Sequence, residues 1–136
     1  MMQLVPVPHA GLSQAWPMVL ADIEAACGKS EGDLTPRLVA ERLNEGVWTL
    51  CIAFAQGDKP YRGAVVLGAE VQPEGRKLFR VVLVGGDAQA WPGLLSEIED
   101  MARVEGCARV VTTCRKGWAK RLKDYRLTRI ELVKEL

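Results

Sequence analysis

Two adjacent glycines, Gly85 and Gly86, are the residues of this sequence whose type and position best suit them for ligand chemistry. An apolar run that ends at Val84 leads into them, and an amphipathic segment begins at Trp91. Free backbone N–H groups and the dipole of a following helix favour an anion at such a strand-to-helix junction. The junction is therefore a candidate phosphate site, although it lacks any complete phosphate-binding motif.

Nucleophilic and metal chemistry have little support in the sequence. His9 is the only histidine, so we expect no metal site and no Ser/His/Asp or Cys/His catalysis. Four cysteines lie inside apolar patterns and have no C-x-x-C spacing, which predicts buried, reduced thiols: Cys27, Cys51, Cys107 and Cys114. The two basic residues after Cys114 would lower its thiol pKa if it were exposed, but a core thiol at a strand end is the favoured interpretation.

Charge is unevenly distributed along the chain, although the net charge is only +1. Residues 109–129 hold eight basic residues and one acid, so this segment carries +7 and the remainder carries −6. Such polarity suits an oriented contact with an acidic partner, a nucleic-acid backbone or a phosphorylated cofactor. The alternative interpretation is a helix with a solvated basic face.

Length and composition indicate one globular domain, residues 1–136. The chain has 136 residues, of which 49% are hydrophobic and 26% charged, as is typical of a soluble domain with its own core. No apolar run approaches the roughly 20 residues that a membrane span needs. The first residues lack the basic start and long apolar core of a signal peptide, so we expect neither a leader nor a membrane anchor.

The first residues predict a strand followed by a helix. Residues 3–7 form a short apolar run that prolines limit. Apolar residues from position 12 to 27 recur at helical spacing. Because Pro17 belongs in a first turn, we expect the regular helix to begin near Ala15, after a looser turn.

A second helix and three strands are predicted next. Thr35 and Pro36 have the residue types of a helix N-cap and a first helical position, and Gly46 can end this helix. Three apolar runs joined by short turns follow it, at 47–55, 62–71 and 77–84. Short turns between neighbouring strands predict an antiparallel meander.

The second half predicts helices alternating with strands. The expected elements are a helix over 91–105, a strand over 108–114, a short basic helix over 116–124 and a half-exposed strand over 127–134. The order is therefore βααβββαβαβ, an α/β (α+β) class with a mixed central sheet. We expect the β-α-β unit in this half to have a right-handed crossover.

This order of elements resembles the general N-acetyltransferase (GNAT) fold over the whole chain. In that fold the fourth strand and the helix after it splay from the fifth strand, and acetyl-CoA enters the wedge between them. The resemblance implies a mixed sheet flanked by helices, with a cofactor site beside Val84, Gly85 and Gly86. Arg115 or Lys116 would then lie near the nucleotide phosphate.

Three segments, 91–107, 114–122 and 131–136, are similar to small GNAT-like proteins encoded among virion genes of tailed bacteriophages. The most specific part is Arg115, Gly117 and Trp118 followed by a basic helix. This resemblance implies a virion protein or an assembly factor, located in the virion or in the host cytoplasm.

The junction departs from the family pattern. The pyrophosphate loop of acetyltransferases reads Gln/Arg-x-x-Gly-x-Gly/Ala directly after the fourth strand. In this sequence the matching place contains Gly85, Gly86 and Asp87, and no basic residue lies in it. The two glycines would still let backbone N–H groups face a phosphate, but the carboxylate of Asp87 would repel it. Asp87 is more simply a turn or cap residue.

The expected acid and base of the family are not evident either. A tyrosine before the last strand usually serves as general acid, and Tyr125 is the only tyrosine nearby. Its position favours a packing role instead. Glu70 is the nearest carboxylate to a general-base position, although a plain surface charge is the simpler interpretation. The catalytic residues are therefore unknown.

Three functions remain open. The first is a non-enzymatic virion-associated or assembly component, with no cofactor, that binds other virion proteins or itself. Its interaction residues would be Lys116, Lys120, Arg121 and Lys123, which would face an acidic subunit or the DNA backbone. The second is an acetyl-CoA-dependent N-acyltransferase that acts on an unknown amine. The third, a simple DNA-binding protein, depends only on the basic segment.

Overall fold

The computed structural model describes residues 2–57, 60–87, 91–114 and 116–136. Its strands are β1 (Met2–Pro6), β2 (Thr49–Ala55), β3 (Tyr61–Val71), β4 (Lys77–Gly86) and β5 (Arg109–Thr112). Its helices are a 3-10 turn (His9–Gly11), α1 (Leu12–Cys27), α2 (Pro36–Asn44), α3 (Trp91–Val104) and α4 (Lys116–Ala119).

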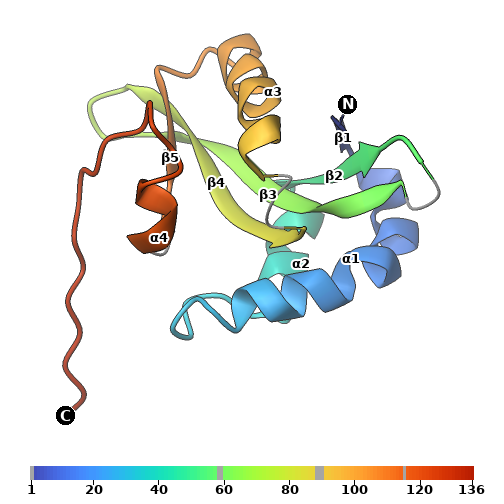
Figure 1. Ribbon diagram of the computed structural model, residues 1–136, viewed down its shortest axis with the longest axis horizontal. Helices are drawn as coiled ribbons and strands as arrows, with labels where there is room; N and C mark the ends of the chain where they lie inside the picture. The colour runs from blue at the N-terminus through green and yellow to red at the C-terminus, as the bar shows by residue number, and fades with distance from the viewer. Residues whose placement is uncertain (1, 58–59, 88–90, 115) are drawn as a thin grey trace.

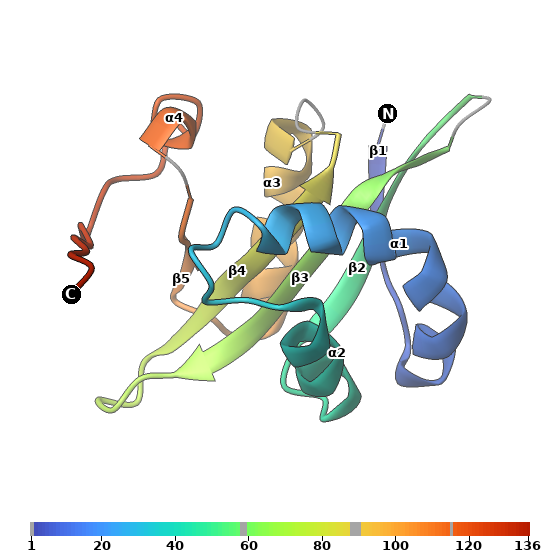
Figure 2. The ribbon, with the colours of Figure 1, turned by 90° about the horizontal axis from the view of Figure 1, so that it is seen from below.

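The five strands form one mixed sheet in the order β1-β2-β3-β4-β5. The first four strands are antiparallel, and β5 is parallel to β4. Helix α3 covers one face of the sheet, and α1 and α2 cover the other (Figures 1 and 2). The predicted α+β class, a mixed sheet flanked by helices, is confirmed.

Strand β3 shows how the sheet separates two cores. Ala64 and Val66 pack against α1 and α2, whereas Val65 and Leu67 pack against α3. Successive side chains of a strand point to opposite faces, so a strand that is covered on both faces must be apolar at every position. This requirement explains the nearly continuous apolar run in this part of the sequence.

Local residue chemistry explains where the first two helices begin and end. The hydroxyl of Thr35 accepts a 3.1 Å hydrogen bond from the amide of Leu38, as expected for the predicted N-cap. Gly46 follows the C-cap residue Glu45 of α2 and adopts a φ of +77°, which suits a glycine. Helix α1 begins earlier than predicted and contains Pro17 in its interior, because Leu12 and Ala15 are buried in its first turn.

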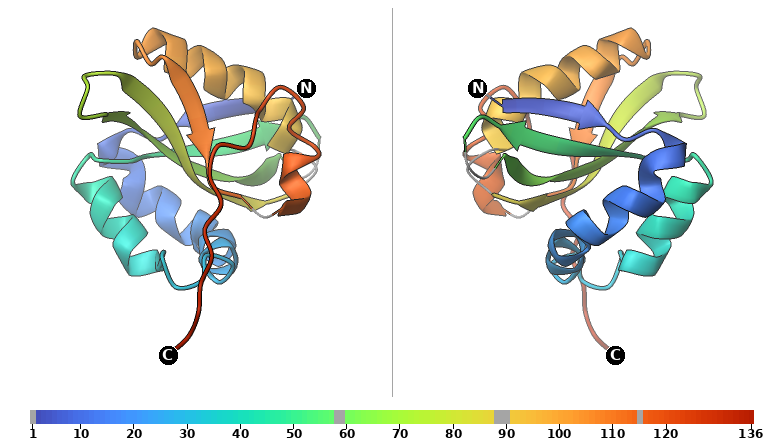
Figure 3. Two further views of the ribbon diagram at one scale, coloured as in Figure 1. Left: turned by 90° about the vertical axis from the view of Figure 1, so that its left-hand side faces the viewer. Right: turned by 90° about the vertical axis from the view of Figure 1, so that its right-hand side faces the viewer.

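The end of the chain differs from the expectation. The predicted basic helix over 116–124 is wrong beyond Ala119: the carbonyl of Trp118 accepts hydrogen bonds from the amides of both Arg121 and Leu122, which closes a turn. The predicted strand over 127–134 is also wrong, since these residues have no secondary structure and are exposed. A strand needs a partner edge, and this segment leads away from the sheet (Figures 1 and 3).

Candidate cofactor wedge between β4 and β5

Strands β4 and β5 pair at their beginnings and then separate. Their register runs from Leu78 opposite Arg109 to Val81 opposite Thr112, where β5 ends. Strand β4 continues to Gly86 and remains paired with β3 on its other side. In the described part of the chain, the last five residues of β4 therefore have no strand on the side of β5. An extended ligand could lie along such an edge, as the resemblance to GNAT proteins implies.

A β-bulge marks the point of separation. Val66 pairs with Leu83 and Leu67 pairs with Val81, so Val82 is an extra residue in β4. A bulge bends its strand and increases the local twist, which turns the end of β4 away from β5. The sequence gives no sign of this bulge, because Val82 has the same apolar character as its neighbours.

Gly85 and Gly86 lie at the end of β4, not in a loop after it as predicted. A Cβ atom on Gly85 would lie 2.6 Å from the backbone oxygen of Asp22 in α1. A Cβ atom on Gly86 would lie 2.6 Å from the backbone oxygen of Arg62 in β3, and Gly86 has a φ of +104°. Backbone atoms of the protein itself thus fill the space that the two missing side chains leave. Close packing accounts for both glycines without any ligand.

The described part of the junction fits a pyrophosphate group poorly. The amide of Asp87 donates a 2.8 Å hydrogen bond to the carbonyl of Arg62, which uses this donor inside the sheet. Pro92, the second residue of α3, has no N–H group to offer to an anion. Residues 88–90 of the junction lie outside the described residues. The cofactor assignment of Val84, Gly85 and Gly86 stays a prediction.

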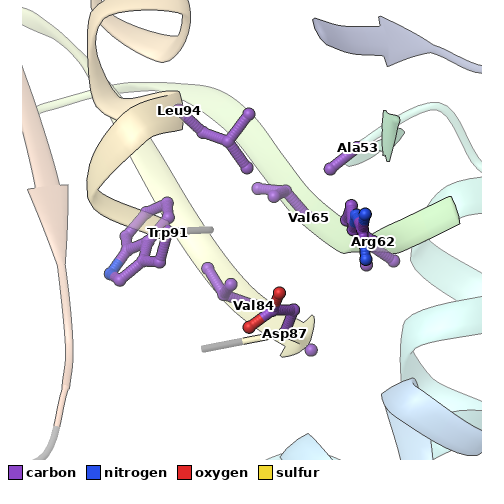
Figure 4. A pocket seen from close by; sticks show the side chains of 10 residues that line it. Ala53, Arg62, Val65, Val84, Asp87, Trp91 and Leu94 are labelled. Carbon is purple, nitrogen blue, oxygen red and sulfur yellow. The ribbon is translucent and has the colours of Figure 1, made fainter. Parts of the chain in front are cut away.

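A small pocket lies between α3 and the adjacent ends of β3 and β4 (Figure 4). Its lining includes Val65 and Val84 from the sheet and Trp91 and Leu94 from α3. Its volume of about 10 Å³ is enough for a single water molecule. An organic ligand usually needs a pocket of roughly 300 Å³ or more. This pocket therefore has no room for an acyl group.

Two tryptophans connect the helices that follow the separated strands. Trp91 is the first residue of α3 and is 4% exposed, and Trp118 is in α4. Their rings pack edge to face, with centroids 6.5 Å apart. The guanidinium of Arg121 lies 5.0 Å from the centroid of the Trp118 ring. Because α3 follows β4 and α4 follows β5, this aromatic pair spans the open end of the wedge. The sequence did not predict this contact.

Tyr125 and Glu70 have structural partners. The hydroxyl of Tyr125 donates a 2.8 Å hydrogen bond to the carboxylate of Glu99 in α3. Partial burial, together with this hydrogen bond and the negative charge of Glu99, raises the pKa of Tyr125 above its usual value of 10.0. Glu70 is an exposed residue near the end of β3 and forms an ion pair with Arg80. These contacts agree with the packing role and the surface charge that the sequence favoured.

The predicted basic residues are only partly described. Arg115 lies outside the described residues, and Lys116 is described as the first residue of α4 but not in its side chain. Lys120, Arg121 and Lys123 are exposed, as an interaction surface requires. Their role as interaction residues stays a prediction.

The cysteines differ from the expectation at two positions. Cys27 and Cys51 are buried, whereas Cys107 is half-buried and Cys114 is exposed. Strand β5 ends two residues before Cys114, so no neighbouring strand covers this thiol. Partial burial of the thiol still raises its pKa rather than lowering it. Among the described residues, no cluster of side chains could hold a metal ion, and no helix has the length and apolar character to cross a bilayer.

Comparison with known proteins identifies the fold. No family model and no curated protein matches the sequence. An acetyltransferase of Trypanosoma brucei has a TM-score of 0.64 at 14% identity, and the match covers 100% of both chains. An aminoglycoside acetyltransferase from an uncultured soil metagenomic sample has a TM-score of 0.70 at 10% identity, covering 100% of this chain and 97% of the other.

A third solved structure extends the comparison to another named activity. The ribosomal-protein-alanine N-acetyltransferase of Brucella melitensis has a TM-score of 0.64 at 14% identity, covering 100% of this chain and 99% of the other. Identities this low bear on the fold alone. The chain has the fold of the GNAT acetyltransferases.

Proposed function

We propose that this protein is a GNAT-fold bacteriophage protein that acts without catalysis, as a virion-associated or assembly component with a degenerate acetyl-CoA site. The observation that carries the proposal is the packing of Gly85 and Gly86 against the backbones of α1 and β3. In a working site, glycines at this position would leave their backbone open to a phosphate. Here they bring three elements of the fold together.

Other contacts around the wedge support this function. The pair of Trp91 and Trp118 spans the open end of the wedge, and the hydroxyl of Tyr125 donates its hydrogen bond to the carboxylate of Glu99. The pocket beside Val84 has room for a single water molecule. These features stabilise the fold. An enzyme would instead need a free catalytic group or room for its substrate here.

The proposed partners are other virion proteins or further copies of this chain. The exposed residues Lys120, Arg121 and Lys123, with Lys116 at the start of α4, would meet an acidic subunit or the DNA backbone. The charge difference between residues 109–129 and the rest of the chain favours one fixed orientation of such a contact. The similarity of residues 114–122 to phage virion proteins supports a location in the virion or the host cytoplasm.

A second candidate function is an acetyl-CoA-dependent N-acyltransferase acting on an unknown amine. The observation in its favour is the free edge of β4 beyond the bulge at Val82, along which an extended chain could pair. The solved structures with this fold include acetyltransferases, which also supports it.

Titration of the purified protein with acetyl-CoA while its melting temperature is measured separates the two functions. A ligand at 100 times its dissociation constant adds about 2.7 kcal/mol of stability, which is readily visible in a domain of this size. We expect no saturable shift at millimolar acetyl-CoA. ATP serves as a control for nonspecific binding of phosphates to the basic residues. A saturable shift with acetyl-CoA that ATP does not reproduce would establish the second function instead.

The virion role needs its own measurement. Mass spectrometry of purified particles, from the phage whose genome encodes this sequence, should detect the protein at a constant ratio to the capsid subunits. If the protein accumulates in the infected cell but is missing from the particles, only the assembly role is supported. Its absence from both particles and assembly intermediates would contradict the proposal.

A further inference from the structure

We infer that a hollow at the start of β1 and the end of β2 binds one unpaired pyrimidine base. The hollow is lined by Gln3 from β1, by Phe54 and Ala55 from β2, and by Gln56, which directly follows β2. Hereafter it is called the β2-end hollow. Such a site goes beyond the proposed function, because it would hold a base whether or not the protein belongs to a virion.

The register of β1 and β2 explains how the β2-end hollow is built. Gln3 lies directly opposite Phe54 in the antiparallel pair, so their side chains lie on the same face of the sheet. Phe54 is half-buried and packs against the core under α1. Gln56 lies two residues beyond Phe54 and lines the hollow with it. Two amide groups and one aromatic ring therefore meet in this hollow.

The size of the β2-end hollow suits one six-membered ring. Its volume is about 140 Å³. A cavity of about 150 Å³ in another protein is large enough to bind benzene. A pyrimidine has a single six-membered ring and fits this volume, whereas the second ring of a purine would extend out of the hollow.

The residue types of the lining favour a neutral ring with polar edges. The lining residues are glutamine, phenylalanine and alanine, so a charged group that entered would lose water without gaining an ion pair. Each glutamine amide offers two N–H donors and a carbonyl acceptor, which match the donors and acceptors at the edge of a base. The ring of Phe54 offers an apolar surface on which a base can stack. A nucleobase combines these properties.

The start of α3 connects the β2-end hollow with the basic residues after α4. Met2 lies directly opposite one of the lining residues, and its side chain lies beside Gly93 in the first turn of α3. Trp91 begins the same helix and contacts Trp118, whose ring lies beside Arg121. Helix α3 thus lies between β1 and α4 (Figure 1). A single strand with a base in the hollow could cross the start of α3 and bring a phosphate to Arg121.

Nuclear magnetic resonance titration of the isotope-labelled protein tests the inference, with thymidine and a short oligothymidylate as the probes. Both probes should shift the side-chain amide signals of Gln3 and Gln56 and leave that of Gln14, an exposed glutamine of α1, unchanged. If the base belongs to a nucleic acid, oligothymidylate should bind about tenfold more tightly than thymidine, because its phosphates contact the basic residues. Equal affinities would support a free pyrimidine nucleoside as the source of the base.

Two exposed glutamines provide a matched pair of variants. Gln3→Ala removes an amide from the β2-end hollow and should weaken oligothymidylate binding about threefold. Gln14→Ala removes an exposed amide from α1 and should leave binding unchanged. Phe54→Leu keeps an apolar side chain but removes the stacking surface, so binding should weaken about tenfold. An oligoadenylate should bind the parent protein less tightly than oligothymidylate does.

Three outcomes would overturn the inference. Unchanged signals of Gln3 and Gln56 with both probes would show that the β2-end hollow holds no base. Equal effects of Gln3→Ala and Gln14→Ala would place any bound strand elsewhere on the protein. Equal affinities for oligoadenylate and oligothymidylate would show that the protein binds the phosphates and not a pyrimidine. If Phe54→Leu does not fold, these three outcomes still decide the question.

Discussion

The phenol of Tyr61 on β3 donates a 2.5 Å hydrogen bond to the carboxylate of Asp22 on α1. The backbone oxygen of the same Asp22 lies against Gly85 on β4. One residue of α1 therefore holds the ends of two neighbouring strands, one through its side chain and the other through its backbone. The glycine that would contact a cofactor phosphate is thereby part of a contact among three elements.

This relationship predicts the effect of Gly85→Ala. The added methyl group would lie 2.6 Å from the oxygen of Asp22, so α1 and β4 must move apart. We expect a loss of about 1–3 kcal/mol in unfolding free energy, and a fall of roughly 4–10 °C in melting temperature. Gly93→Ala is the control, because its methyl group would lie 3.7 Å from Met2 Cε in ordinary contact. A Gly85→Ala variant as stable as the parent would mean that this packing does not limit the position.

Stability should fall at alkaline pH because of the tyrosines. The chain has two tyrosines, Tyr61 and Tyr125, and both donate to carboxylates. Partial burial first, then the hydrogen bond and charge of the carboxylate, raise the pKa of each phenol above 10.0. A group whose pKa is raised by folding stabilises the native state below its unfolded pKa and loses that contribution as pH rises further. Unfolding free energy should therefore decrease above about pH 10.

The tyrosinate absorbance of the folded protein measures this directly. Neither tyrosine should ionise in its normal pH range until the protein unfolds. The double variant Tyr61→Phe, Tyr125→Phe should show a flatter dependence of melting temperature on pH between 9 and 11. Normal ionisation of one tyrosine in the folded parent would show that its hydrogen bond is not maintained in solution.

The amide of Leu4 on β1 donates a hydrogen bond to the carboxylate of Glu97 on α3, and this contact predicts the effect of Glu97→Ala. Removing this carboxylate leaves the outward amide of Leu4 without its acceptor, so we expect a loss of about 1–2 kcal/mol in denaturant unfolding. Glu97→Gln keeps an oxygen acceptor and should lose less. Glu24→Ala, at an exposed position of α1, should leave stability unchanged within about 0.5 kcal/mol. Equal losses for the alanine and glutamine variants would exclude the hydrogen bond as the cause.

Thiol reactivity should distinguish Cys114 from the other cysteines. Cys114 is exposed, whereas Cys27 and Cys51 are buried and burial raises the pKa of Cys51 to about 12. A thiol reagent should therefore modify one residue of the native protein quickly and the buried pair only on unfolding. Cys114→Ser should remove the fast phase. A fast phase that persists in this variant would assign the reactive thiol to Cys107.

Residue periodicity and local chemistry were sufficient to predict most elements of the fold. The strands β1 to β5, the helices α1 to α3 and the cap at Thr35 follow from patterns within a few residues of one another. The bulge at Val82 does not, because a register between two strands is not encoded in either strand alone. Residues 127–134 were predicted as a strand from their alternation, but they have no secondary structure, since local periodicity does not provide a partner strand.

The candidate site also has features that the local sequence predicts and features that depend on contacts between distant residues. The sequence predicted a strand that ends at Val84 with Gly85 and Gly86 directly after it, whereas in the structure both glycines belong to β4. Their residue types cannot distinguish a phosphate cradle from close packing, since a glycine serves both. The approach of Asp22, more than sixty positions earlier, gives Gly85 a packing reason that its residue type does not reveal. A packing contact between positions so far apart cannot be predicted from the local sequence, and the cofactor role of the glycines stays a prediction.

The contact between Trp91 and Trp118 gives the last prediction. Trp118→Ala would remove an edge-to-face aromatic pair and a cation–π contact with Arg121, and it would expose Trp91 to water. We expect a red shift of tryptophan fluorescence and a loss of about 1–2 kcal/mol in stability, and Trp118→Phe should restore part of it.

Acetyl-CoA should still give no saturable thermal shift with Trp118→Ala, because Gly85 and Gly86 remain packed against α1 and β3. A shift that appears in this variant and not in the parent would show that the aromatic pair, rather than the glycine packing, closes the wedge. In that case the end of β4 would retain a cofactor site that α4 covers, and the degenerate-site assignment would have to be withdrawn.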